Sequence, residues 1–371
     1  MALSLGLIGG GFMGKAHALA YRAAGAVFGD LPEVRLATFC DLPHDTAETL
    51  ADQFGFAQAT DDWQALIDDP IIDIVSITVP NALHKTIALA ALAAGKHIHC
   101  EKPLSLTLPD AQEMEAAARK ATGRTLVGYN YLHNPIVRLA RRLIDEGEIG
   151  RPVHFRGWVD EDYQADPDLP WSWRARRADA GLGTLGDLGC HLVSMSNLMM
   201  GPIDSLVADT QIIHETRSLP DGSGEAPVEN EDTASAIVRY ASGAQGTLCS
   251  SRSAWGRKNK LDWEVHGTRG MITFSQERLN ELQIYTADGP RDRQGFRTIL
   301  AGPEHAPYGN FCPAPGHQLG FGDLKTIEVA SLLRAIANGE EASPSFTDAL
   351  AFESAIHAID TSAREGRRVT L

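Results

Sequence analysis

Near its start the chain carries an apolar stretch that runs directly into glycines, Leu3-Ser4-Leu5-Gly6-Leu7-Ile8-Gly9-Gly10-Gly11-Phe12-Met13-Gly14. The apolar part predicts a buried strand, and a helical pattern follows over about 13–24. In such a unit Gly9 permits a tight turn, Gly11 lets backbone N–H groups approach a pyrophosphate, and Gly14 lets the helix pack closely on the strand. The order of strand, G-x-G-x-x-G loop and helix predicts a dinucleotide-binding Rossmann domain. The loop supplies the first expected cofactor contacts, which are Gly9, Gly11, Phe12, Met13 and Gly14.

An acidic residue follows the next predicted strand, which runs from Val34 to Cys40. Dinucleotide-binding folds place a carboxylate at this point, where it binds the ribose hydroxyls of NAD and repels the extra phosphate of NADP. Asp41 comes 27 residues after Gly14 rather than about 20, and the insert at 28–32 accounts for the excess. We therefore expect NAD as the cofactor, with Asp41 on its ribose.

Strands and helices alternate as far as about Gly128, which predicts a doubly wound parallel sheet. In such a sheet ligands bind outside the carboxyl ends of the strands. Residues 71–78 read as a buried strand of this sheet, so the residues after it should lie beside the cofactor. The further expected cofactor contacts at strand ends are Thr78, Pro80, Asn81, His84, Glu101 and Lys102.

The stretch His97-Ile98-His99-Cys100-Glu101-Lys102-Pro103 brings a short strand straight to an acid and a lysine. A lysine at the carboxyl end of a parallel strand points toward whatever the crevice binds, and Pro103 keeps Lys102 out of helical geometry. A solvated Lys-Pro turn is the structural alternative, because such turns are common in loops.

Beyond about residue 150 the pattern changes to alternating strands, such as those at 153–159, 234–240, 246–250 and 261–266. This predicts a second, α+β domain with a large, mostly antiparallel open sheet. We expect a Rossmann NAD-binding domain over 1–130 and a substrate-binding and oligomerisation domain over 131–371, with the option that the C-terminal helices pack back on the first domain. Apolar strand faces favour a homo-oligomer, a tetramer or dimer, and 216–230 reads as an exposed loop.

A second glycine-rich turn, at 181–191, enters a predicted helix and carries Asp187 and His191. Residues four apart project from one face of an α-helix, so the carboxylate and the imidazole should be neighbours. The helix dipole favours anionic Asp187 and neutral His191, and a neutral imidazole beside a carboxylate can act as a general base. A capping aspartate with a packed structural histidine explains the pattern equally well. We expect no metal site, because no third ligand of suitable spacing accompanies the pair.

The composition narrows the class of partner. A net charge of -15 argues against nucleic acid and anionic membranes and favours a small neutral substrate. The five cysteines are scattered, which predicts neither a disulfide framework nor a zinc site and favours a reducing, cytoplasmic setting. The apolar start lacks the basic region of a signal peptide, and no stretch reaches the roughly 18 apolar residues of a membrane span.

Three motifs in this order resemble the Gfo/Idh/MocA oxidoreductase family over essentially the full length: the early glycine loop, Glu101-Lys102-Pro103, and Asp187-x-x-x-His191. Within the family, the segments 9–17, 166–174 and 295–298 resemble the branch that contains scyllo- and myo-inositol dehydrogenases and levoglucosan dehydrogenase. The resemblance implies NAD-dependent oxidation of a ring secondary hydroxyl of a cyclitol or pyranose, foremost of an inositol to the inosose. The alternatives are a levoglucosan or other sugar 3-dehydrogenase and an NAD-dependent redox-cycle glycosidase. A non-catalytic NAD-binding scaffold would not need the three motifs together.

The resemblance also implies roles for individual residues. Lys102, Asp187 and His191 take the positions of the family's catalytic lysine, aspartate and histidine. On this assignment His191 is the general base, Asp187 orients it and contacts a neighbouring hydroxyl, and Lys102 polarises the reacting oxygen. One departure is His133, where relatives often carry arginine. The remaining expected substrate contacts are Tyr131, Glu161, Trp171, Arg174 and His317.

Overall fold

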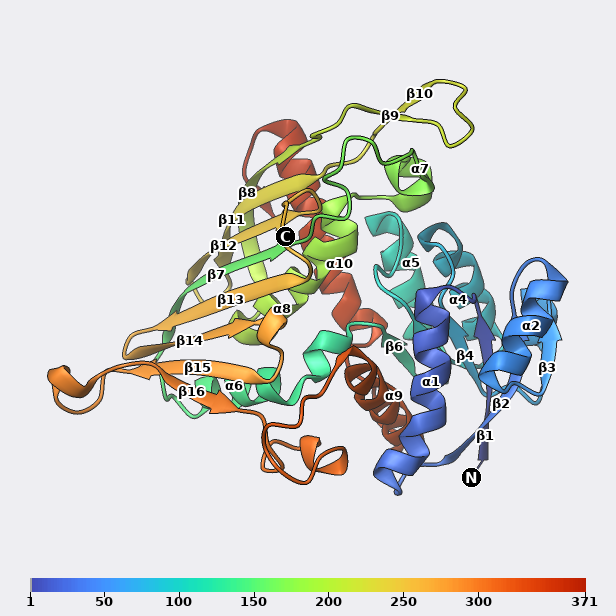
Figure 1. The fold of residues 1–371 in the computed structure, drawn as a ribbon, viewed down its shortest axis with the longest axis horizontal. Helices are drawn as coiled ribbons and strands as arrows, with labels where there is room; N and C mark the ends of the chain where they lie inside the picture. The colour runs from blue at the N-terminus through green and yellow to red at the C-terminus, as the bar shows by residue number, and fades with distance from the viewer. Residues whose placement is uncertain (1) are drawn as a thin grey trace. The chain divides into compact units, whose positions relative to one another are not determined.

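The computed structural model describes residues 2–371, and the chain divides into two compact units. Unit 1 runs to Asn130 and also includes Gly320–Leu350. Unit 2 comprises Tyr131–Leu319 and Ala351–Leu371. Unit 1 is therefore assembled from two stretches of chain that are far apart in the sequence. Figure 1 shows the elements of both units.

Among the described residues, unit 1 contains a six-stranded sheet in the order β3-β2-β1-β4-β5-β6, and its neighbouring strands pair in parallel. This order is that of a doubly wound dinucleotide-binding fold, so the predicted fold class of the N-terminal half is confirmed. The strands are β1 (Ala2–Ile8), β2 (Glu33–Cys40), β3 (Gln58–Thr60), β4 (Ile74–Ile77), β5 (His97–Cys100) and β6 (Thr125–Val127). The helices are α1 (Phe12–Phe28), α2 (His44–Phe54), α3 (Trp63–Asp68), α4 (His84–Ala93), α5 (Leu108–Ala118) and α9 (Phe321–Asn338), with the short 3-10 turn η1 (Asn81–Leu83).

The core of unit 1 joins its two stretches of chain. Leu5 and Leu7 of strand β1 belong to a cluster of buried apolar side chains, and Tyr21 of α1 packs in the same cluster. From α9, Leu332 and Leu333 complete this cluster. Each fully buried apolar side chain of this size contributes about 1.5–3 kcal/mol. The burial explains why a helix encoded near residue 330 belongs with the first strand of the chain.

Unit 2 holds a nine-stranded sheet within the described part of the chain, in the order β16-β15-β14-β13-β7-β12-β11-β8-β17. Its neighbouring strands pair antiparallel, except that β7 and β12 pair in parallel. The predicted mostly antiparallel sheet of the second domain is therefore confirmed for the part of the chain that the structure describes. The strands are β7 (Pro152–Asp160), β8 (Ile203–Gln211), β11 (Thr233–Tyr240), β12 (Gln245–Ser251), β13 (Lys260–Gly267), β14 (Gly270–Ser275), β15 (Glu281–Thr286), β16 (Arg297–Leu300) and β17 (Val369–Thr370).

Helices pack on the sheet of unit 2 through a close approach at a glycine. A Cβ at Gly157 of β7 would lie 2.6 Å from Leu192 Cδ1, so the missing side chain lets the helix come close. The helices are α6 (Pro135–Asp145), α7 (Arg177–Ala180), α8 (Cys190–Met200) and α10 (Phe346–Glu365). The shorter turns are η2 (Asn130–His133), η3 (Trp173–Ala175), η4 (Leu185–Gly189), η5 (Gln276–Arg278), η6 (Arg291–Arg293) and η7 (Tyr308–Asn310), of which η4 is π-helical.

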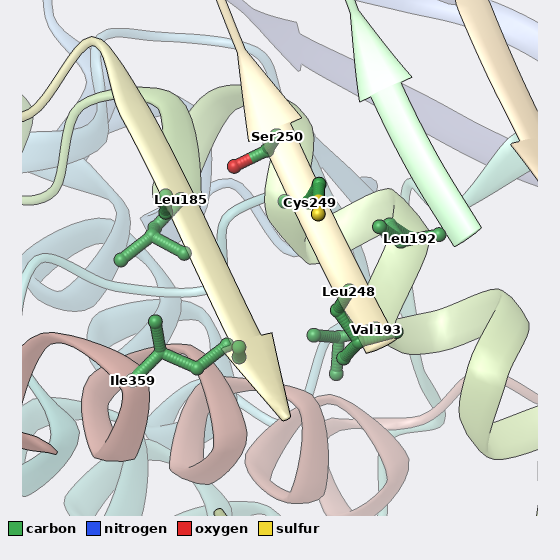
Figure 2. A pocket seen from close by; sticks show the side chains of 10 residues that line it. Leu185, Leu192, Val193, Leu248, Cys249, Ser250 and Ile359 are labelled. Atoms are coloured by element: carbon green, nitrogen blue, oxygen red, sulfur yellow. The ribbon is translucent and has the colours of Figure 1, made fainter. Parts of the chain in front are cut away.

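A small cavity remains between α8 and the sheet of unit 2. Figure 2 shows that its walls are mainly aliphatic side chains, among them Leu185, Leu248 and Ile359. Ser250 contributes a hydroxyl group to this lining. Because a hydroxyl-rich ligand needs several hydrogen-bonding partners, this cavity is a packing gap behind the helix and not a candidate for such a ligand.

The segment 216–230 is mostly exposed, as expected, but it contains two short strands and is not a continuous loop. Strands β9 (Thr216–Ser218) and β10 (Glu225–Pro227) pair as an antiparallel hairpin, and only the tip between them is a turn. Arg217 is buried and donates to the carbonyl oxygens of Gln164 and Asp166. The glycines and prolines of the segment hid these two short strands. Over residues 2–371, no helix combines the length and apolar character needed to cross a membrane.

Candidate functional site

The strands of unit 1 end in register. Ile8 is level with Cys40 and Ile77, Ile77 with Cys100, and Cys100 with Val127. The residues that follow these ends therefore emerge along one edge of the sheet, and they are Gly9, Asp41, Thr78, Glu101 and Gly128. The edge includes the point between β1 and β4 where the strand order reverses, which is where doubly wound sheets bind ligands.

The glycine loop has the geometry that a bound pyrophosphate requires. Gly9 has a φ of +103°, and a Cβ there would lie 2.7 Å from the carbonyl oxygen of Thr78. A Cβ at Gly14 would lie 2.0 Å from the carbonyl oxygen of Gly9, so this glycine is needed for packing. At Gly11, by contrast, an added Cβ meets nothing within 4 Å. Open space beside the N-terminus of α1 is what the phosphates of a dinucleotide need, so these residues fit NAD.

Asp41 lies against this loop. A Cβ at Gly10 would be 2.4 Å from Asp41 Oδ2, and Oδ1 accepts the N–H of Leu42 at 2.7 Å. A carboxylate in this place can accept hydrogen bonds from a ribose diol and repels an added phosphate. The geometry thus agrees with the expected preference for NAD, and direct contact with the ribose stays a prediction.

Two of the expected cofactor residues turn their side chains to the backbone. The Thr78 hydroxyl is 3.0 Å from the carbonyl oxygen of Ile8 and 2.8 Å from that of Gly9, so it braces the glycine loop. His84 is buried, with its ring nitrogens 2.9 Å from Pro103 O and 3.0 Å from Val79 O. Both residues support the edge of the sheet, whether or not they also contact the cofactor.

Other expected contacts stand at the starts of helices. Pro80 has extended backbone and precedes Asn81, the first residue of η1. Phe12 begins α1 with 73% of its surface exposed, and its ring centroid is 5.5 Å from that of Phe321 on α9. Met13 is half-buried in the same turn of α1. Their contacts with a cofactor remain predictions.

Glu101 and Lys102 leave β5 in different surroundings. Lys102 is half-buried, whereas Glu101 is buried. Glu101 Oε1 accepts from His17 Nε2 at 2.9 Å and from Lys325 Nζ at 2.7 Å. Burial alone raises the pKa of Glu101, but the Lys325 ammonium and the hydrogen bond from His17 hold it well below its usual value. Glu101 is therefore an anion whose charge is balanced by the Lys325 ammonium.

Asp187 of unit 2 is held by residues from two other segments. Tyr163 Oη donates to Asp187 Oδ2 at 2.6 Å, and Arg174 Nε lies 4.0 Å from the same oxygen. Burial, followed by the charge of Asp187, raises the pKa of Tyr163 well above its usual value, so the phenol stays a donor. Tyr163 was not predicted from the sequence. The available signal was its place in the loop after β7, two residues beyond Glu161.

His191 lies in the first turn of α8 and is 7% exposed. Its ring packs on Tyr131, with ring centroids 4.7 Å apart, and Tyr131 Oη accepts from Asn259 Nδ2 at 3.0 Å. The single α-helix expected to carry both Asp187 and His191 is instead the π-helical turn η4, which carries Asp187, followed by α8, which carries His191. A π-turn bonds i to i+5 and so changes the angle between residues four apart.

The residues that begin this turn are hydrogen-bonded to buried Glu231. Glu231 accepts the N–H of Leu185 through Oε1 at 3.0 Å and that of Thr184 through its carbonyl oxygen at 2.8 Å. A Cβ at Gly183 would lie 2.1 Å from the same carbonyl, so the glycine is required for this approach. The residue after Glu231 is Asp232, which pairs with buried Arg252 at 2.7 Å. The turn that carries Asp187 is therefore held by a rigid partner.

The remaining predicted substrate residues differ in their setting. Trp171 Nε1 donates to Pro227 O at 3.0 Å, which ties its indole to the β9–β10 hairpin. Arg174 is exposed and stacks 4.5 Å over the Trp173 ring. Glu161 is half-buried in the loop after β7, and its N–H donates to Ser251 O at 2.9 Å. His317 is exposed in a turn, with Nδ1 3.1 Å from Ala314 O.

The departure at position 133 falls on a buried residue. His133 is 1% exposed, and its Nδ1 lies 3.2 Å from Arg138 Nη2, which donates to it. An arginine therefore does reach this place, but it comes from α6 and not from position 133. The imidazole acts here as part of the packing of η2, beside Tyr131.

Comparison with known proteins matches both halves of the chain to one family. A family model described as an oxidoreductase family with an NAD-binding Rossmann fold matches residues 3–129, and the GFO/IDH/MocA C-terminal domain matches 137–273. The first match confirms NAD as the predicted cofactor and the protein as an oxidoreductase.

Individual relatives agree over nearly the whole length. Levoglucosan dehydrogenase of Pseudarthrobacter phenanthrenivorans is 41% identical over 360 residues, which cover 93% of this chain and 92% of the relative. A solved structure of levoglucosan dehydrogenase with NADH and levoglucosan superposes with a TM-score of 0.96 at 40% identity, over 100% of this chain and 99% of the other. Inositol 2-dehydrogenase of Rhizobium meliloti is 27% identical over 378 residues, with 100% of both chains covered. The chain belongs to the Gfo/Idh/MocA family of NAD-dependent oxidoreductases.

Proposed function

We propose that this protein oxidises a secondary ring hydroxyl of an anhydropyranose of the levoglucosan type, as a sugar 3-dehydrogenase. The observation that carries the proposal is 41% identity to a levoglucosan dehydrogenase over 93% of the chain, against 27% to an inositol 2-dehydrogenase. The preference for an inositol that the sequence motifs suggested therefore gives way to its alternative.

The residues of the candidate site supply the groups that such an oxidation needs. Bound NAD supplies the hydride acceptor. His191 takes the proton of the hydroxyl, since a positioned imidazole is the usual base at neutral pH. Lys102 stabilises the negative charge that develops on the oxygen as this proton leaves.

Asp187 is suited to hold a neighbouring hydroxyl of the sugar. Its side chain is 36% exposed, it accepts a hydrogen bond from Tyr163, and it lies 4.0 Å from Arg174 Nε. Tyr163 thus joins the proposed substrate residues because it sets the position of the Asp187 carboxylate. Recognition of a polyol needs several such hydrogen bonds. The other proposed contacts are Tyr131, Glu161, Trp171, Arg174 and His317.

The proposal is tested by the absorbance of NADH formed with levoglucosan, myo-inositol, scyllo-inositol and D-glucose under identical conditions. We expect the highest kcat/KM with levoglucosan and one NADH for each sugar oxidised. A higher kcat/KM with either inositol would overturn the choice of substrate. Consumption of sugar without net NADH would instead indicate a redox-cycle glycosidase. Formation of a homo-oligomer stays a prediction and is measured separately by light scattering.

A further inference from the structure

A network of buried polar side chains lies behind the Glu101–Pro103 loop in unit 1. Its members come from α1, β4, β5 and α9 and from the residue after β5, and each is at most 5% exposed. They are His17, Ser76, His99, Glu101, Lys325 and Glu328. Buried charges are costly unless they are paired, so a network of this size calls for an explanation.

The protonation of His17 follows from its hydrogen-bond partners. His17 Nε2 faces the Glu101 carboxylate, which only accepts, so Nε2 donates and Nδ1 accepts from Ser76 Oγ at 2.7 Å. Burial, and then the neighbouring His99 ring and Lys325 ammonium, lower the pKa of His17 well below its usual value, which keeps it neutral. His99 Nε2 lies 2.8 Å from Glu328 Oε1, and its Nδ1 lies 3.3 Å from Tyr21 Oη.

Lys325 is the cation of this network. Its Nζ donates to Glu101 Oε1 and to Glu328 Oε1, at 2.7 Å each. Burial lowers the pKa of Lys325, but the two carboxylates outweigh burial and raise it, so the ammonium stays charged. The ligand atoms of His17, His99 and Glu328 lie within 4.8 Å of one another, as a metal ion would require. The ring nitrogens of both histidines and Glu328 Oε1 already take part in the hydrogen bonds above, and the ammonium supplies the positive charge that a metal would bring.

The network reaches Lys102 through Glu101. Glu101 Oε2 accepts the backbone N–H of Lys102 at 3.2 Å, while His84 lies 2.9 Å from the carbonyl oxygen of Pro103. Gly128, the residue after β6, packs directly against the Glu101 carboxylate, because a Cβ there would lie 2.4 Å from Glu101 Oε1. The backbone is therefore bonded at the Lys102 N–H and at the Pro103 carbonyl, and Gly128 packs against the Glu101 carboxylate.

We propose that Lys325 is a positioning residue for the reaction, which fixes the backbone of Lys102 by holding the Glu101 carboxylate. The inference rests on the proposed function through the role of Lys102. A misplacement of about 1 Å in a catalytic group can lower a rate by about 100-fold. The ammonium on α9 thus links a helix from the end of the chain to the lysine that acts on the substrate.

The first variant is Lys325→Met, which keeps the length of the side chain and removes its charge. We expect kcat to fall at least about tenfold, while the Kd for NAD changes by less than about threefold. In that variant Glu101 keeps the hydrogen bond from neutral His17 of α1, whose ring stacks on His99 of β5. It loses the ammonium that it shares with the Glu328 carboxylate of α9. Without the ammonium the pKa of Glu101 rises, so its carboxylate becomes protonated as pH falls. The kcat profile should gain a limb that declines toward acid pH.

The second variant, Gly128→Ala, keeps every charge and displaces the Glu101 carboxylate by steric contact. It should lower kcat in the same manner without the new acid limb. If Lys325→Met does not fold, an unchanged kcat in Gly128→Ala still overturns the proposal. The control is Lys96→Met. Lys96 is also a buried lysine of unit 1, but it lies before β5 and donates to Asp69 O and Ile72 O at 2.8 Å each. Its loss should lower stability and leave kcat and the pH profile unchanged.

Hydrogen exchange of the Lys102 amide gives a readout that needs no substrate. Exchange should be at least about tenfold faster in Lys325→Met and in Gly128→Ala than in the wild type, and unchanged in Lys96→Met. Unchanged exchange together with kcat within about twofold of wild type in the folded variants would overturn the positioning role. If the wild type oxidises none of the sugars, the proposed function fails, and amide exchange alone then decides whether Lys325 holds Lys102.

Discussion

Gly11→Ala should separate cofactor binding from folding. The backbone at Gly11 has φ −65° and ψ −169°, which is extended geometry that alanine adopts without strain, and its new Cβ meets nothing within 4 Å. The substitution therefore leaves every packing contact of the loop in place. The methyl group would, however, stand in the open space beside the N-terminus of α1 that we assign to the pyrophosphate.

The two effects have opposite signs and can be estimated. A glycine replaced by alanine at a compatible site stabilises a protein by about 0.4–1 kcal/mol, because the unfolded chain loses freedom. On binding, the methyl group costs at least one hydrogen bond to a charged phosphate, worth about 1.5–3 kcal/mol. Since about 1.4 kcal/mol corresponds to a factor of ten, we expect the Kd for NAD to rise roughly 10- to 100-fold.

Calorimetric titration with NAD and urea unfolding measure the two quantities. Gly25→Ala is the matched control, because it lies in the same helix and its Cβ also meets nothing within 4 Å. It should stabilise the protein by about 0.5–1 kcal/mol and leave NAD binding unchanged. Gly14→Ala should destabilise it, since a Cβ would sit 2.0 Å from Gly9 O. Equal NAD affinity in Gly11→Ala and Gly25→Ala would refute the cofactor assignment of the loop.

Four further substitutions test the rest of the site. Asp41→Ala should reduce the preference for NAD over NADP at least about tenfold in kcat/KM, and a wild type with no preference would contradict this role. Lys102→Ala should lower kcat about 100-fold with little change in the KM for NAD, which steady-state kinetics can separate; a near-normal kcat would leave Lys102 a turn residue. His191→Ala should lose about 100-fold or more in oxidation and the rise of activity with pH, and a retained pH profile would move the base elsewhere. Tyr163→Phe removes the phenol that donates to Asp187 at 2.6 Å, so the KM for the sugar should rise about fivefold while NAD binding is kept, and an unchanged KM would exclude Tyr163 from recognition.

The parts of the molecule that the sequence predicted well are those in which neighbours in the chain are neighbours in space. The turn from β1 through Gly9 to α1 is a single local unit, and glycines stand where a Cβ would clash with the neighbouring backbone. Asp41 and Lys102 could be placed because the end of a buried strand can be read from a run of apolar residues. Parallel pairing then brings those ends to one edge of the sheet, so the predicted edge followed from topology alone.

The parts that the sequence did not predict depend on partners that are distant in the chain. Tyr163 meets Asp187 across 24 residues, and Lys325 meets Glu101 across 224 residues. No local pattern distinguishes Lys325 from a solvated lysine, since it stands in a helix beside Asp323 and Glu328. The π-turn at 185–189 was not predicted for another reason: the spacing of Asp187 and His191 fits an α-helix equally well, and the hydrogen bond from Leu185 N–H to Glu231 joins residues 46 apart in the chain.

The position of Lys325 carries an energetic argument about why the network exists. Replacement of a buried ion pair by apolar side chains of similar volume is often neutral or stabilising, whereas removal of one partner costs about 3–5 kcal/mol. A helix that served only to complete the core of unit 1 could therefore bury leucines at this point, as α9 does at Leu332 and Leu333. Instead its buried lysine stands at the strand edge, where Glu101 shares its carboxylate with the backbone of Lys102. Stability alone does not account for a lysine at this place, whereas the need to hold Lys102 in one position does.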